Sequence, residues 1–141
     1  MGTVFPRNLT LRLGWGVLVC LLPAFARAGV DLSFGNTYSG DISLAGQEDR
    51  YTFTGTAGQR LYYDAVDYDF DMVIVQLIDP GGRIIFAPNS DTDFGPFTLT
   101  ESGKYTVLQK GVGDYTNDYT FRLLDLAAAA AITYGTIITD Q

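Results

Sequence analysis

Histidine is absent from this chain, and cysteine occurs only once, as Cys20. These two shortages remove the commonest general base, the histidine-assisted serine and cysteine nucleophiles, and the usual zinc ligands. Paired carboxylates remain as a catalytic device, but in a chain with 16 acids some pair is always close. The composition therefore predicts a protein that is not an enzyme.

Basic side chains are also scarce, since nine Lys and Arg face 16 Asp and Glu, a formal net charge of −7. Binding of nucleic acid depends on Lys and Arg that neutralise phosphate, and anionic membrane surfaces attract basic segments. The excess of acid therefore argues against nucleic acid and anionic lipid as partners.

Residues 1–28 have the three parts of a secretory signal peptide. Arg7 and Arg12 lie in a basic leader, residues 13–22 form an apolar run, and the sequence closes on Ala26-Arg27-Ala28. This small-x-small pattern precedes signal peptidase cleavage sites. We expect cleavage after Ala28 and a mature chain that is secreted, periplasmic or on the cell surface.

The apolar run 13–22 is much shorter than the roughly 20 residues that span a bilayer, so we expect no membrane insertion after cleavage. A lipid on Cys20 is the less favoured alternative, because Val19 stands where lipoproteins carry a small residue. Cys20 leaves with the leader, so the mature fold uses no disulfide. A domain of about 100 residues can bury enough apolar surface without one.

The mature chain reads as short β-rich runs separated by Gly, Asp, Asn and Pro. Short antiparallel strands with two apolar faces predict an all-β fold, an antiparallel and jelly-roll-like β-sandwich over residues 29–126. Eight strands are predicted, over residues 37–43, 49–54, 60–66, 72–79, 83–86, 97–100, 104–110 and 117–125.

Alternation with period two predicts which side chains face the core. Thr52, Thr120 and Arg122 are expected to point outward. The side chains expected to be buried are Tyr51, Phe53, Val73, Val75, Leu77, Tyr105, Val107, Tyr119, Phe121 and Leu123.

Residues 127–141 differ from the rest. The Ala-rich stretch is too short for a stable helix and is interpreted as a linker. After it, Thr133, Tyr134, Gly135 and Ile137 match the Thr-Tyr, Gly and Ile of residues 37–42 with one residue skipped. This match predicts the start of a second repeat in a longer, tandem protein. The alternative is a C-terminal strand that completes the first domain.

A run of alternating acids is the sharpest local feature. In an extended chain, Asp67, Asp69 and Asp71 share one face at a spacing of about 6.6 Å. Asp91 and Asp93 form a second acidic segment that could close on the first. Because Ca²⁺ takes oxygen ligands from acidic loops, these five residues form a hypothetical Ca²⁺ site. The alternative is a pair of solvated acidic loops.

Four aromatic residues lie near these acids: Tyr62, Tyr63, Tyr68 and Phe70. They could offer a platform on which sugar rings stack. Strand aromatics also serve as core residues or cross-strand pairs, and this alternative stays open.

Several short motifs, in order, resemble the bacterial pre-peptidase C-terminal domain. They are Gly40-Asp41-Ile42, residues 48–53 and 58–61, the strand and turn at 71–82, residues 102–107 and Tyr119-Thr120-Phe121. The resemblance implies a secreted β-sandwich that is a non-catalytic accessory of peptidases and other large exported proteins. Some members of that family bind Ca²⁺ or polymeric substrates.

The expected function is therefore that of an accessory or spacer module in an exported, multi-domain protein. Its expected partners are other domains or repeats of the same protein. The alternative is a module that binds carbohydrate or another extracellular polymer, with Ca²⁺ as a stabilising ion.

Overall fold

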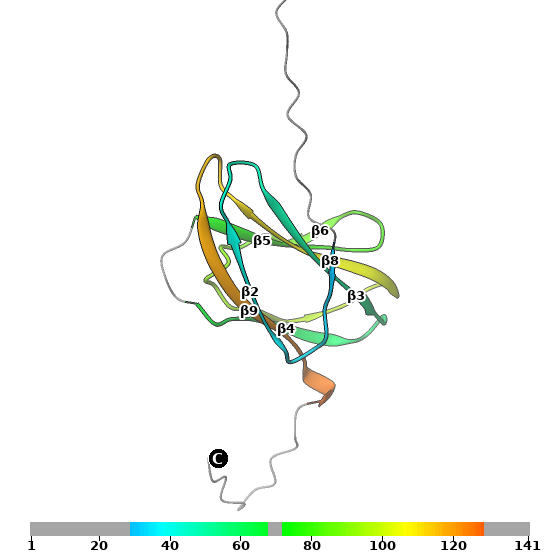
Figure 1. Ribbon diagram of the computed structural model, residues 1–141. Coiled ribbons are helices and arrows are strands. Elements are labelled where there is room, and N and C mark those ends of the chain that lie inside the picture. Colours follow the sequence, from blue (N-terminus) through cyan, green and yellow to red (C-terminus); the bar gives the residue numbers. More distant parts are fainter. Residues whose placement is uncertain (1–28, 68–71, 129–141) are drawn as a thin grey trace, which may run out of the picture.

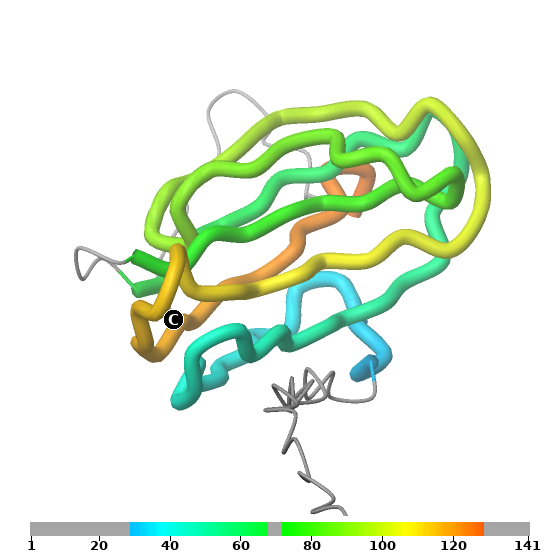
Figure 2. The backbone as a smooth tube through the Cα atoms, turned by 90° about the horizontal axis from the view of Figure 1, so that it is seen from above, coloured from blue at the N-terminus to red at the C-terminus, as the bar shows by residue number. Residues whose placement is uncertain are grey.

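The computed structural model describes residues 29–67 and 72–128, which form two β-sheets packed face to face (Figures 1 and 2). In this part of the chain the only helix is a short 3-10 turn, η1 (Leu126–Ala128). The strands are β1 (Val30–Asp31), β2 (Thr37–Ile42), β3 (Glu48–Gly55), β4 (Arg60–Ala65), β5 (Val73–Ile78), β6 (Ile84–Phe86), β7 (Phe94–Thr98), β8 (Gly103–Gly111) and β9 (Asn117–Asp125).

One sheet has five strands in the order β1-β3-β8-β5-β6, and the other has four in the order β2-β9-β4-β7. All neighbours are antiparallel except β1, which runs parallel to β3. The predicted antiparallel β-sandwich is thus confirmed, with one parallel edge strand added.

The core lies between the sheets and is built from the alternating residues of the long strands. Val73, Val75 and Leu77 of β5 are fully buried, and Tyr105 and Val107 of β8 are buried beside them. The remaining side chains expected in the core are buried as well, namely Tyr51, Phe53, Tyr119, Phe121 and Leu123. Period-two alternation therefore identified the inner faces correctly.

Thr52 departs from the expectation of an exposed residue. It lies on the outer face of its sheet, yet it is only 8% exposed, because β1 runs beside it. The Thr52 hydroxyl donates to Asp31 Oδ1 at 3.0 Å. The covering strand β1 was not predicted.

The predicted strand 97–100 is shifted, since β7 begins at Phe94 and contains Pro96. Proline lacks the N–H that a ladder requires, so it reads as a strand breaker in the sequence. In the fold, β7 is the edge strand of the four-stranded sheet, where one side of the backbone needs no partner.

The expected signal peptide (1–28) and the expected second repeat within 129–141 lie outside the described residues. Within the described part, no helix is long and apolar enough to cross a membrane.

Candidate functional site

Four loops begin and end at one end of the sandwich, and their described residues are 43–47, 66–67 with 72, 87–93 and 112–116. The strand register places them together, because Ile42 pairs with Asn117, Glu48 with Lys110, and Val73 with Gly111. We name this region the loop end. The loops after β1, β3, β5 and β7 lie at the opposite end.

A buried polar network lies beneath the first of these loops. The Tyr119 hydroxyl donates to Asp49 Oδ2 at 2.8 Å and shares a second hydrogen bond of 2.9 Å with the Tyr51 hydroxyl. Gln47 Nε2 donates to Asp49 Oδ1 at 3.2 Å and to the Asp41 carbonyl at 2.7 Å. The network therefore ties the loop 43–47 to the core.

Burial raises the pKa of Tyr119 well above its ordinary value, and its hydrogen bond to Tyr51 adds to this effect. The phenol therefore stays protonated and remains a donor to Asp49. A Cβ on Gly40 would lie 2.2 Å from the Tyr119 hydroxyl oxygen, so only glycine leaves room for the ring. This is the physical role of the glycine in the Gly40-Asp41-Ile42 motif.

Hydrogen bonds fasten the loop 87–93 to both sheets, and two of them join its backbone to Val73 and Val75 of β5. Asp93 Oδ1 accepts from the Ala65 amide at 2.8 Å, and its Oδ2 accepts from the Tyr62 hydroxyl at 3.1 Å. The Tyr63 hydroxyl donates to the Ser90 carbonyl at 3.0 Å. The loop therefore lies directly beside the end of β4, where the first acidic segment begins.

Of the residues of the hypothetical Ca²⁺ site, the described ones, Asp67, Asp91 and Asp93, lie at the same end of the fold. Asp67 follows β4, and Asp93 bonds to the backbone of β4. Asp91 accepts a hydrogen bond from the Thr92 hydroxyl at 3.0 Å. Asp69 and Asp71 lie outside the described residues, and the described residues alone hold no group of three metal-ligating side chains. The Ca²⁺ site stays a prediction.

The aromatic residues considered for sugar binding do not share one surface. Tyr63 is fully buried and stacks on Phe121, with ring centroids 5.4 Å apart. Tyr62 lies on the opposite face of β4. Tyr68 and Phe70 lie outside the described residues. Tyr63 is therefore a core residue, which is the alternative to a sugar-binding role.

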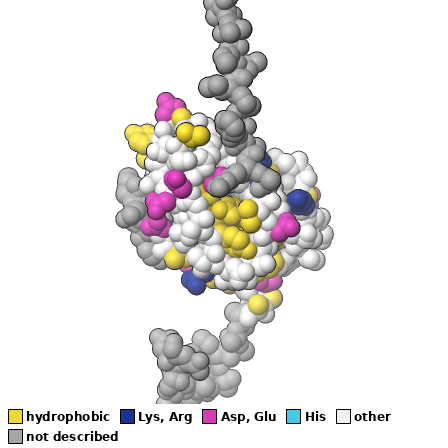
Figure 3. Space-filling view, in the orientation of Figure 1, with side chains coloured by type: hydrophobic (Ala, Val, Ile, Leu, Met, Phe, Trp, Pro, Cys, Tyr) yellow, Lys and Arg dark blue, Asp and Glu magenta, His cyan; other side chains and the backbone are white. Residues whose placement is uncertain are grey.

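Exposed hydrophobic side chains gather at the loop end. Leu44 is 59% exposed and Tyr115 is 57% exposed, and Val66, Met72 and Val112 are also exposed. The Val112 amide donates to the Met72 carbonyl at 2.8 Å, so these residues come from neighbouring loops. In Figure 3, hydrophobic and acidic side chains lie over the tips of the loops that connect β2 to β3 and β8 to β9, and no Lys or Arg is seen among them.

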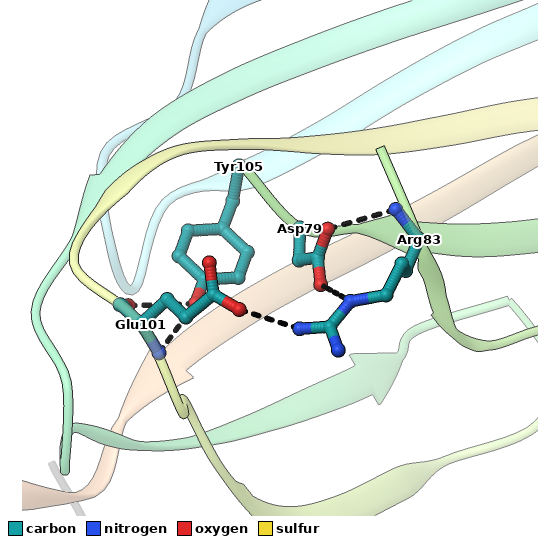
Figure 4. Close-up of polar contacts among 4 residues, drawn as sticks. All are labelled: Asp79, Arg83, Glu101 and Tyr105. Atoms are coloured by element: carbon teal, nitrogen blue, oxygen red, sulfur yellow. Dashed lines mark hydrogen bonds and ion pairs between the residues drawn. The ribbon is translucent and has the colours of Figure 1, made fainter. Parts of the chain in front are cut away.

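The opposite end is held by a cluster around Asp79, drawn in Figure 4. Asp79 accepts from the Arg83 amide at 2.8 Å and from Arg83 Nε at 2.7 Å, and Arg83 Nη2 lies 2.5 Å from Glu101 Oε1. The Tyr105 hydroxyl donates to the Glu101 carbonyl at 2.7 Å. These contacts join the β5–β6 turn to the segment before β8.

The pKa of the Asp79 carboxyl lies below its ordinary value, chiefly because the Arg83 amide donates to it and then because of the Arg83 guanidinium. The hydrogen bond between the Arg83 guanidinium and the Asp79 carboxylate in turn raises the pKa of Arg83. Gly82 completes the turn with a φ of 85°, a conformation that favours glycine. The hydrogen bonds and ion pairs of this cluster join its own residues to one another, so we assign it a structural role.

Comparison with known proteins gives matches in structure and none in sequence. No family model matches the chain, and no curated protein matches it. Among solved structures, a periplasmic inhibitor of g-type lysozyme from Aeromonas hydrophila has a TM-score of 0.56 and 16% identity, over 68% of this chain and 94% of that one. The Salmonella Typhimurium inhibitor of g-type lysozyme has a TM-score of 0.52 and 20% identity, over 68% and 96%.

The pre-peptidase C-terminal domain of Bacillus anthracis collagenase is a further match. It has a TM-score of 0.53 and 14% identity, over 72% of this chain and 97% of that domain. The chain thus has the fold of the pre-peptidase C-terminal domain, as the sequence resemblance implied. The lysozyme inhibitors share this fold, and at these identities the likeness concerns the fold alone.

Proposed function

We propose that this chain is a non-catalytic module of an exported protein and that its loop end binds another protein outside the cytoplasm. The observation that carries the proposal is the group of exposed apolar side chains at the loop end, above all Leu44 and Tyr115. Exposed large hydrophobic residues that cluster on loops are typical of protein-binding surfaces.

The underlying structure supports the same function. The network of Gln47, Asp49 and Tyr119 holds one loop against the core, and Asp93 and Ser90 hold another. Loops that are fixed before binding lose little conformational entropy when a partner docks. The solved structures of this fold support the non-catalytic role, because they include inhibitors of g-type lysozyme and the pre-peptidase C-terminal domain of a collagenase.

The expected leader supports a location outside the cytoplasm, in agreement with the periplasmic inhibitors of the same fold. The proposal includes the accessory role within a multi-domain protein, because the protein bound by the loop end can be another domain of the same polypeptide or a separate polypeptide. A spacer module differs from both cases, because its loops bind no partner.

Site-specific photo-crosslinking in the producing cells tests the proposal. One variant carries benzoylphenylalanine in place of Tyr115, and the matched control carries it in place of Ile84, which lies on β6 and is 53% exposed. We expect one defined protein adduct from position 115 that is absent from position 84. Adducts of equal pattern at both positions, or none at 115, would refute the proposal and leave the module a spacer.

Once the partner is identified, its affinity for the double variant Leu44→Ser with Tyr115→Ser is measured as a second test. Burial of a large apolar side chain is worth about 1.5–3 kcal/mol, and a central tyrosine is a frequent hot spot. We expect affinity to fall by at least about 30-fold. The control Ile84→Ser with Ile85→Ser should leave affinity unchanged within about twofold.

A further inference from the structure

We propose that the partner of the loop end is a cationic protein, and that its Lys and Arg side chains are received at one corner of the sandwich. This inference rests on the proposed function, because it names the chemistry of the partner that this end binds. The corner is formed by β2, β9 and the two loops beside them, and we name it the acidic corner. Its residues are Asp41, Leu44, Val112, Asp114, Tyr115 and Asp118.

Two carboxylates face each other directly across strands at this corner. Asp41 of β2 is paired in register with Asp118 of β9, and both are exposed. The next outward pair along these strands, Ser39 and Thr120, shares a hydrogen bond of 3.0 Å. Like charges directly opposite one another destabilise a sheet. The pair of Asp41 and Asp118 therefore lowers the stability of the sheet, whereas a pair of hydroxyl residues, such as Ser39 and Thr120, would not.

The other acids of the described chain are engaged. Asp64 pairs with Arg122, Asp79 with Arg83, and Glu48 with Arg50. Asp31, Asp91, Asp93 and Asp125 accept hydrogen bonds from neighbouring groups. Among the described residues, the acids with neither an ion pair nor a side-chain hydrogen bond are Asp41, Asp114 and Asp118. All three lie at the acidic corner.

Among the residues that the structure describes, no Lys or Arg forms an ion pair with the acids of this corner. The four loops of the loop end contain no Lys or Arg in the sequence. Lys110, the nearest along the chain, lies on the other sheet opposite Glu48. A cation that neutralises Asp41 and Asp118 must therefore come from outside the described domain.

Apolar side chains give the corner its second component. Leu44, Val112 and Tyr115 lie in the same two loops, which connect β2 to β3 and β8 to β9, and they are exposed. Protein interfaces combine an apolar centre, often with tyrosine, and a charged rim that attracts and orients the partner. A hydrated metal ion would use the acids and leave the apolar residues in water. A cationic protein surface uses both.

The experiment uses the full exported chain and the partner isolated through the Tyr115 adduct. Asp41→Asn with Asp118→Asn removes the facing charges. The control, Asp31→Asn with Asp125→Asn, removes the same net charge elsewhere, and each Asn keeps one carbonyl oxygen that can accept a hydrogen bond. Association and dissociation rates are measured at low and high salt, and melting temperatures are measured for each variant.

We expect Asp41→Asn with Asp118→Asn to weaken binding about tenfold at low salt, mostly through slower association, and to reduce its salt dependence. The control should change affinity by less than about twofold. The same double variant should melt at a higher temperature than the wild type, because the repulsion is gone. Weaker binding by a more stable protein cannot result from unfolding.

Unchanged affinity in Asp41→Asn with Asp118→Asn, or binding that does not depend on salt, would overturn this inference and leave the proposed function standing. A melting temperature that rises with millimolar Ca²⁺ or Mg²⁺ at matched ionic strength, and only when both acids are present, would assign the corner to a metal ion instead. The absence of any specific Tyr115 adduct would overturn the proposed function and this inference together.

Discussion

Tyr119→Phe deletes one hydroxyl group from the core and leaves the ring in place. That hydroxyl donates to Asp49 Oδ2 at 2.8 Å and shares a hydrogen bond of 2.9 Å with Tyr51. Tyr119 is 1% exposed, so water does not replace the lost donor. A hydrogen bond to a carboxylate contributes about 1.5–3 kcal/mol and a neutral one about 1 kcal/mol. We therefore expect a loss of about 2–4 kcal/mol in the free energy of unfolding.

For a domain of about 100 residues, each kcal/mol lowers the melting temperature by about 4–8 °C, so Tyr119→Phe should melt at least about 8 °C lower. Thermal unfolding followed by near-ultraviolet circular dichroism measures the shift, with urea unfolding as a second measure of stability. Tyr115→Phe is the matched control, because it removes the same group from an exposed side chain. A Tyr119→Phe protein that melts within about 2 °C of the control would refute the role given to the buried network.

Three further predictions concern the core and the ends of the fold, and one concerns the leader. Val75→Asp should abolish cooperative unfolding, because Val75 is fully buried and an unpaired carboxylate there costs several kcal/mol. Asp79→Asn should lower the melting temperature at pH 7, and the difference should shrink as the pH falls below about 3.8. The reason is that the lowered pKa of Asp79 stabilises the fold only while the carboxyl is ionised, as melting curves across this pH range will check. Ca²⁺ should raise the melting temperature by several degrees over a chelator at matched ionic strength, and Asp69→Asn should reduce this shift; equal curves would leave the acidic loops as solvated surface. N-terminal sequencing of the exported protein should begin at Gly29, and an intact leader or a lipid on Cys20 would contradict the expected cleavage.

The long strands could be predicted from the sequence because alternation needs only local information. Val73, Val75 and Leu77 mark the inner face of β5 without any knowledge of its neighbours. The short strand β1 could not be predicted in this way, since its two residues contain no period and its partner β3 lies in another part of the chain. The burial of Thr52 was missed for the same reason.

The candidate site was only partly predictable. The sequence drew attention to the acids at 67–71 and 91–93, and the topology places Asp67, Asp91 and Asp93 at the loop end. It gave no reason to single out Asp41 and Asp118, which are far apart in sequence and meet only through the pairing of β2 with β9. Tyr62 and Tyr63 could not be told apart from the sequence for a different reason. They have the same side chain and are adjacent, and only the pleat of β4 decides that Tyr63 is the buried one.

The order of the strands also determines when this domain can fold. Only β5 and β6 pair with a neighbour in sequence, whereas β2 and β4 both pair with the last strand, β9. Sheets built from distant segments form slowly, because a long loop must close before any contact is gained. Neither sheet can be completed early in synthesis, since β8 is central to one and β9 to the other. The domain therefore stays unfolded until Asp125 has been made, and an unfolded polypeptide is the form that the expected leader would direct through a narrow export channel.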